Sequence, residues 1–132
     1  MGFKEIRHTA DRALLVWGKD IETLFKEAGL GMYSLLALHS EPSPMVTRVF
    51  SASGADFESL LVMFLSELLF YLEQEDLVFT TFDLQFHTGE LKATMRGSTV
   101  NRSVKMIKAV TFHNLDITKL HHGFQVEIVF DV

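Results

Sequence analysis

The sequence predicts an α+β fold, a two-layer sandwich in which two principal helices pack on one face of a mainly antiparallel sheet. Two segments, 20–38 and 56–72, have the i, i+3, i+4, i+7 spacing of apolar residues that is typical of amphipathic helices. Several other segments alternate apolar and polar residues with a period of two, which is typical of half-buried strands. Runs of strands that follow runs of helix favour the α+β class.

The first predicted helix begins after Asp20, which is a suitable N-cap, and extends to Leu38. Gly29 and Gly31 weaken this helix, because each glycine costs about 1 kcal/mol relative to alanine in a helix interior. We therefore expect close packing at the two glycines. Its apolar face consists of Ile21, Leu24, Phe25, Ala28, Met32, Leu35 and Leu36.

The second predicted helix extends from Asp56, again placed as a cap, to Leu72, and its broad apolar stripe marks it as the more buried helix. Thr88 and Gly89 are predicted to form a hairpin turn, because glycine supplies the positive φ that such turns require. The period-two segments that predict strands are 46–50, 78–87, 91–96 and 124–130.

Length and composition favour one compact domain, 1–132, with 48% hydrophobic and 22% charged residues. The 12 Lys and Arg against 17 Asp and Glu give a formal charge of −5, which disfavours tight, unaided binding of nucleic acid. The absence of cysteine excludes disulfides, thiolate zinc sites and cysteine nucleophiles and suits a reducing compartment. We find no export signal or membrane-spanning segment, so we expect a cytoplasmic protein with no membrane partner.

Two aspartates lie at positions from which they could contribute to one acidic cluster. Asp11 ends a polar turn that begins at His8, and Asp131 lies one residue before the α-carboxylate of Val132. If the three groups converge, the cluster either holds a proton abnormally or binds a hard cation such as calcium or magnesium. Taken alone, the spacing favours an aspartate that stabilises its own turn and a solvated strand end.

Lys108 to His113 form a third segment of interest, in which alternation places Lys108, Val110 and Phe112 on one face. Lys108 either snorkels at the margin of the sheet or offers a cation to a phosphate or a partner carboxylate. His113 is either a satisfied core or edge histidine or an acid or base. In an extended segment, His121 and His122 would face opposite ways, so we do not expect zinc there.

No complete catalytic set is present in the sequence. It lacks a glycine-rich phosphate loop, a Gly-x-Ser-x-Gly turn, a His-Glu-x-x-His helix motif and a dinucleotide fingerprint. The residues themselves therefore lead to a small α+β domain with a candidate hard-cation site.

Four segments, taken in order, resemble the archease family over the whole chain. Phe112 stands where the family has Tyr, Phe64 where it often has Trp, and Gly97-Ser98 replaces a common Gly-Glu. The four matching segments are the His8-Thr9-Ala10-Asp11 turn leading to Gly18, the central helix from Asp56 with 58–61 and 65–70, Lys108-Ala109-Val110-Thr111-Phe112-His113, and Val129-Phe130-Asp131-Val132.

The resemblance implies a noncatalytic activator of an RtcB-type RNA ligase, which joins RNA ends in tRNA splicing and RNA repair through a guanylylated histidine. It implies that Asp11, Asp131 and Val132 bind a divalent cation, with calcium as the first choice and magnesium or manganese as alternatives. Lys108, His8 and His113 would belong to the surface that meets the partner. RNA would be contacted only through the ligase.

Two other functions compete with this one. In a metal-dependent phosphohydrolase, Asp11 and Asp131 would hold magnesium and His113 or His8 would act as base. Such enzymes usually need more carboxylates than this cluster offers. A chaperone-like modulator of RNA-modifying enzymes would instead bind a partner such as an RNA methyltransferase without affecting ligation.

Overall fold

The computed structural model describes residues 1–6, 11–36, 38–40, 43–101, 107–112 and 114–132. Two helices and a set of antiparallel strands make up these residues, which confirms the α+β class. None of the described helices is long and apolar enough to cross a membrane.

The strands form two separate sheets. In the first, β9 lies between β2 and β7, β1 pairs with the other edge of β2, and β8 pairs with the start of β9. In the second, β6 is the central strand and pairs with β3, β4 and β5. The first sheet contains β1 (Gly2–Ile6), β2 (Arg12–Gly18), β7 (Ala109–Thr111), β8 (Thr118–Leu120) and β9 (Gly123–Asp131); the second contains β3 (His39–Ser40), β4 (Val46–Ser53), β5 (Leu77–His87) and β6 (Glu90–Asn101).

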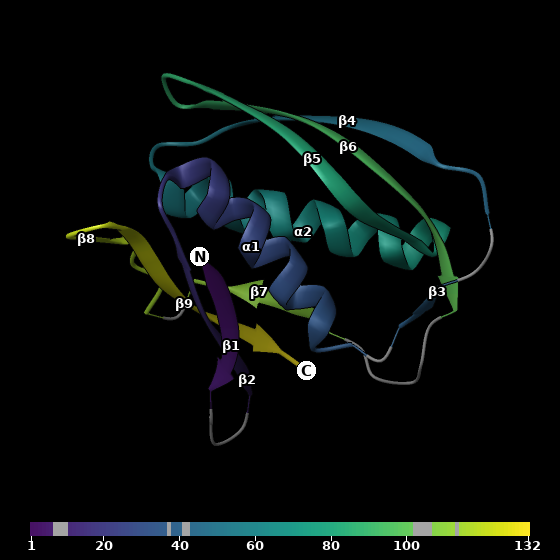
Figure 1. The fold of residues 1–132 in the computed structure, drawn as a ribbon, viewed down its shortest axis with the longest axis horizontal. Helices are drawn as coiled ribbons and strands as arrows, with labels where there is room; N and C mark the ends of the chain where they lie inside the picture. The colour runs from purple at the N-terminus through teal and green to yellow at the C-terminus, as the bar shows by residue number, and fades with distance from the viewer. Residues whose placement is uncertain (7–10, 37, 41–42, 102–106, 113) are drawn as a thin grey trace.

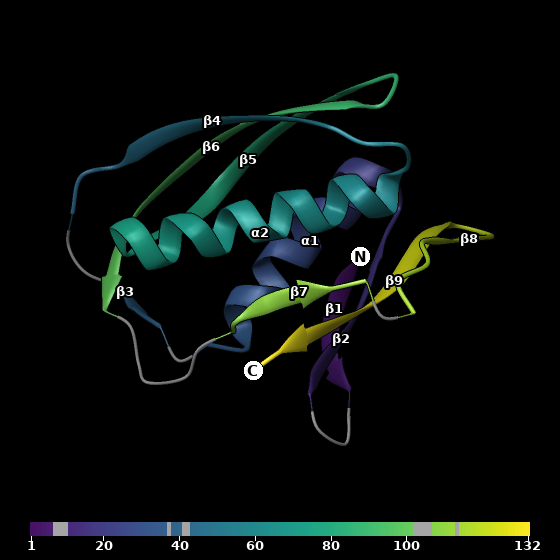
Figure 2. The ribbon, with the colours of Figure 1, turned by 180° about the vertical axis from the view of Figure 1, so that it is seen from behind.

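The two helices, α1 (Ile21–Ser34) and α2 (Phe57–Glu75), lie between these sheets (Figures 1 and 2). Both helices contact strands of both sheets, so the molecule has three layers in the order sheet, helices, sheet. This replaces the predicted two layers, in which the helices pack on one face of a single sheet. The physical reason lies in α2. At 100° per residue, its buried side chains cover an arc of about 200°, which is too wide for one sheet to cover. These side chains are Leu60, Leu61, Val62, Phe64, Leu65, Leu68 and Leu72.

Both helices begin where the sequence predicts. Asp20 accepts a hydrogen bond from the Thr23 N–H at 2.7 Å, and Asp56 accepts one from the Ser59 N–H at 2.8 Å. The end of α1 differs from the prediction, since the helix stops at Ser34. Its last turn is closed by the N–H of Leu35, which donates to the carbonyl of Met32 at 3.1 Å.

The two glycines of α1 are places of close packing, as predicted. A Cβ added to Gly31 would overlap the side chain of Leu14 on β2 and lie 2.9 Å from the ring of Phe3. A Cβ added to Gly29 would lie 3.1 Å from Leu68 on α2. Gly31 therefore sets the approach of α1 to the five-stranded sheet, and Gly29 sets its approach to α2.

The predicted hairpin is the connection between β5 and β6. Gly89 has a φ of 73°, and the register pairs His87 with Glu90 across the turn. This hairpin carries the second sheet past the helices and away from the C-terminus (Figure 1).

Candidate cation site at the end of the five-stranded sheet

The pairing of β2 and β9 brings Asp11 and Asp131 to the same end of the five-stranded sheet. The two strands are antiparallel, and their last pair is Arg12 opposite Phe130. Asp11 immediately precedes Arg12, and Asp131 immediately follows Phe130. The two aspartates therefore adjoin the same pair of residues, one on each strand.

Strand β7 brings Lys108 and Val132 to this end from the other side. Ala109 is paired with Asp131, and the N–H of Lys108 donates to the carbonyl of Asp131 at 2.7 Å. Lys108, Asp131 and Val132 are all exposed to solvent, and Asp11 is partly buried. Figure 2 shows the C-terminus at the end of β9, next to the start of β7. We refer to Asp11, Lys108, Asp131 and Val132 as the acidic tip.

The structure does not place the two histidines predicted for the partner surface. His8 and His113 lie outside the described residues. Both stay predictions from the sequence.

Arg12 is the residue of this region that the sequence did not single out. Its guanidinium donates to both carboxylate oxygens of Glu5 on β1, at 3.0 and 3.1 Å, and also to the carbonyl of Leu35 after α1. The Arg12 guanidinium thus links β1, β2 and the end of α1. Because Arg12 follows Asp11 in the chain, these hydrogen bonds restrain the backbone that carries the Asp11 carboxylate. Its partners lie 7 and 23 residues away in the sequence, so no local signal could have revealed them.

The acidic tip offers oxygen donors to a hard cation. Two aspartate carboxylates and a terminal carboxylate are ligands that Ca²⁺ and Mg²⁺ prefer, with water to complete the shell. In the part of the chain that the structure describes, no three His, Asp or Glu side chains form a metal-binding group. Two carboxylates leave most of a cation's shell to main-chain oxygens, water or a partner, and a site with so few protein ligands favours weak, exchangeable binding.

His121 and His122 do not have the extended geometry that the sequence suggested. They form the turn between β8 and β9, and their ring centroids are 4.4 Å apart in an edge-to-face arrangement. Two imidazoles make an incomplete zinc site, since structural zinc takes four protein ligands and catalytic zinc takes three.

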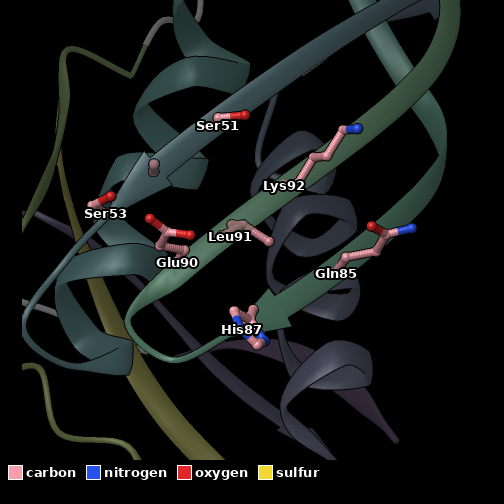
Figure 3. A pocket seen from close by; sticks show the side chains of 8 residues that line it. Ser51, Ser53, Gln85, His87, Glu90, Leu91 and Lys92 are labelled. Carbon is pink, nitrogen blue, oxygen red and sulfur yellow. The ribbon is translucent and has the colours of Figure 1, made fainter.

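A hollow of about 360 Å³ lies on the four-stranded sheet, away from the acidic tip. Its polar side chains come from neighbouring positions of β4, β5 and β6, among them Glu90 and Lys92. Figure 3 shows Lys92, Gln85 and His87 set apart from one another on the two strands of the hairpin, with the ends of Lys92 and Gln85 leading away from His87, so they do not converge on a common ligand. This hollow does not resemble an active site.

Comparison with known proteins shows the family of the chain. The model of the Archease protein family matches residues 3–132. The chain belongs to the archease family. Its curated relatives include the archease proteins of Methanosarcina barkeri, 32% identical over 98% of this chain and 95% of the relative, and of Saccharolobus islandicus, 32% identical over 98% of each chain.

Solved structures show the same archease fold. The solution structure of Methanobacterium thermoautotrophicum protein 1598 covers 99% of each chain with a TM-score of 0.74 and 25% identity. A crystal structure from Thermotoga maritima, described as an archease and possible chaperone, covers 98% of this chain and 96% of that one with a TM-score of 0.71 and 21% identity. The second likeness shows the fold alone.

Proposed function

We propose that this archease-family chain is a noncatalytic activator of an RtcB-type RNA ligase, promoting guanylylation of the ligase and its multiple turnover in tRNA splicing and RNA repair. The observation that carries the proposal is that Asp11 and Asp131 adjoin the last pair of β2 and β9, Arg12 opposite Phe130. Residues far apart in the sequence thus flank one end of the five-stranded sheet, where Asp131 and Val132 are exposed and a partner can reach them.

The donors of the acidic tip fit a divalent cation. Asp11, Asp131 and the terminal carboxylate of Val132 would hold it, with calcium as the first choice and magnesium or manganese as alternatives. When bound, such a cation supplies positive charge for phosphate oxygens. Asp131 also fixes the position of β7, because its carbonyl accepts the N–H of Lys108. Lys108 would add a second positive charge to the same surface.

The negative charge of the chain fits an activator that does not bind RNA itself. A formal charge of −5 opposes direct binding of a polyanion, so RNA is contacted only through the ligase. The same charge favours approach to a basic enzyme surface, where complementarity raises the rate of encounter.

The test is multiple-turnover RNA ligation by the RtcB-type ligase of the same organism, with excess RNA ends, GTP and metal. We expect wild-type chain to raise turnover at substoichiometric amounts and Asp131→Asn to lose this effect. Glu127→Gln is the matched control, since Glu127 is an exposed acid on the same strand, and it should activate fully. Equal activation by wild type and Asp131→Asn would contradict the role of the acidic tip.

A second candidate is a chaperone-like modulator of RNA-modifying enzymes. The description of the Thermotoga maritima relative as a possible chaperone favours it. Stable binding to an RNA methyltransferase, together with no effect on ligation, would support this candidate over the first. Hydrolysis of nucleotide or RNA by the isolated chain would instead favour a metal-dependent phosphohydrolase.

A further inference from the structure

One side of α2 is exposed and partly apolar. Met63 is 38% exposed and Phe70 is 53% exposed, although both are large apolar side chains. The prediction that α2 is the more buried helix is wrong, since 7 of its 19 residues are buried against 7 of the 14 residues of α1. At 100° per residue, six positions fall within an arc of about 120°. We call these six residues the outer face of α2: Met63, Ser66, Glu67, Phe70, Glu73 and Gln74.

The described strands leave this face uncovered. Figure 2 shows α2 in front of α1, with β4 above it and β7 below it, and no described strand crosses it. The opposite side of α2 is covered by α1, as Figure 1 shows. Phe25 of α1 and Phe64 of α2 meet there with ring centroids 5.8 Å apart.

The charge of this helix has one sign only. Between Asp56 and Asp76 the sequence contains six acidic residues and no Lys, Arg or His. Some of the acids have structural roles: Glu58 accepts the N–H of Ile117 at 2.9 Å, and Glu75 pairs with Arg48. Glu67 and Glu73 lie on the outer face itself. Burial raises the pKa of the half-buried Glu67 carboxyl, because its charged form has lost part of its water.

Phe70 is held in place from the side. Its ring packs edge to face against the ring of Tyr71, with the ring centroids 5.5 Å apart. The Tyr71 ring in turn packs against the fully buried ring of Phe79, again with centroids 5.5 Å apart. A partly exposed aromatic ring supported in this way loses little conformational freedom when a partner covers it. Such side chains are the usual anchors of protein interfaces.

We propose that the outer face of α2 docks on a protein surface that offers an apolar pocket rimmed by lysine and arginine. Resting on the proposed function, we assign that surface to the RNA ligase, because an enzyme that binds RNA ends must carry basic side chains to neutralise phosphates. Charge complementarity selects this occupant. A second copy of the chain would bring Glu67 and Glu73 against the same acids, which like-charge repulsion opposes.

The position of the face suits joint use with the acidic tip. Strand β7 packs against α2 and begins at Ala109, which is paired with Asp131. The three residues of β7 span about 10 Å at about 3.3 Å per residue. A partner that covers the outer face of α2 can therefore also reach the acidic tip.

The test measures the dissociation constant of the purified ligase and this chain, at low and high salt, for wild type and two double variants. Met63→Ser with Phe70→Ser should raise the dissociation constant tenfold or more, because it removes the apolar anchors. Glu67→Lys with Glu73→Lys should raise it as well and should weaken its dependence on salt. Val49→Ser with Glu90→Lys is the matched control, since both residues are exposed on the four-stranded sheet, and it should bind as wild type does.

Docking and activation are separable in this design. Asp131→Asn should fail to activate even at a concentration that saturates the ligase, whereas the serine variant should activate fully once its concentration is high enough to saturate the ligase. Normal binding and failed activation by wild type would contradict the proposed function alone.

Unchanged affinity of both double variants, or no binding by wild type, would overturn the docking proposal. It would also be overturned by a wild-type homodimer that Met63→Ser with Phe70→Ser dissociates. The lysine variant leaves the apolar side chains of α2 unchanged, so it remains informative should the serine variant fail to fold.

Discussion

Asp131 lies where strands β2, β7 and β9 meet, and its side chain can be changed without disturbing its backbone contacts. Asp131→Asn keeps the size of the side chain and the carbonyl that accepts the N–H of Lys108. It removes one of three negative charges available to a cation. The variant therefore isolates the contribution of charge at the acidic tip.

We expect calcium to raise the thermal stability of wild type and to leave Asp131→Asn and Asp11→Asn unchanged. A ligand that binds only the folded state at ten times its dissociation constant stabilises it by about 1.4 kcal/mol. For a weak site, with a dissociation constant of about 1 mM, this needs about 10 mM calcium. Thermal unfolding followed by circular dichroism measures the shift, with Glu127→Gln as the control. An equal shift in wild type and both asparagine variants would place the calcium elsewhere.

Asp20 links the stability of α1 to pH. Its carboxylate accepts the N–H of Thr23, and this hydrogen bond is the main cause of its lowered pKa. A group whose pKa is lower in the folded state stabilises that state above its unfolded pKa of about 3.9, and the contribution is lost as pH falls through the folded pKa. The contribution is therefore complete at pH 7 and declines below about pH 4.

Asp20→Ala should destabilise the protein by about 1 kcal/mol at pH 7, and this difference from wild type should shrink by pH 3. Asp20→Asn should keep most of the stability at pH 7, because asparagine is also a good N-cap. Urea unfolding at the two pH values measures both effects. A difference between Asp20→Ala and wild type that stays constant from pH 7 to pH 3 would show that the charge of Asp20 has no role.

Residue roles could be predicted from the sequence where their partners are near in the chain. Asp20 and Asp56 cap their helices through hydrogen bonds to residues three positions later, and both were predicted. Arg12 escaped prediction because its partners, Glu5 and Leu35, are brought to it by strand pairing and by the end of α1. That Asp11 and Asp131 lie at the same end of one sheet follows only from the register of β2 and β9, whose last pair adjoins both residues, and their joint binding of a cation stays a prediction.

At the scale of elements, Gly31 determines how closely α1 lies against the five-stranded sheet. Alanine at this position would gain about 1 kcal/mol of helix propensity. Its methyl group would, however, overlap the side chain of Leu14 and crowd the ring of Phe3. Overpacking of a dense core typically costs about 1–3 kcal/mol, so the loss exceeds the gain.

We therefore expect Gly31→Ala to lower the free energy of unfolding by about 1 kcal/mol, measured by urea titration. Gly29→Ala is the matched control, because its methyl group would crowd only the end of the Leu68 side chain, at 3.1 Å, and would lie at ordinary contact distances of 3.6 and 3.7 Å from the rings of Phe82 and Phe64. It should be less destabilising than Gly31→Ala. A Gly31→Ala variant more stable than wild type would show that α1 can move away from β2 without cost.

The ends and layers of elements were harder to predict than their existence. The apolar spacing of α1 continues through Leu35 and Leu36, which are buried although they follow the helix. Buried residues of a loop thus extended the helical pattern, and no glycine or proline marked the end at Ser34. Alternation likewise predicted strands correctly but carried no information on which strands share a sheet. The second sheet follows only from the wide buried arc of α2.

At the scale of the whole molecule, two acidic surfaces are joined by one strand. The acidic tip lies at the start of β7, and α2, whose outer face is acidic and partly apolar, packs against β7. Both surfaces belong to a chain with a formal charge of −5. Such a molecule suits a basic partner that binds the outer face of α2 and contacts the acidic tip at the same time.

The most direct test of this arrangement is the rate at which the RtcB-type ligase becomes guanylylated, measured as GMP covalently attached to the ligase in the absence of RNA. Wild-type chain with divalent cation should raise the rate, Glu127→Gln should raise it equally, and Asp131→Asn should leave it at the level of the ligase alone. Acceleration by Asp131→Asn equal to that by wild type would contradict the central role of the acidic tip.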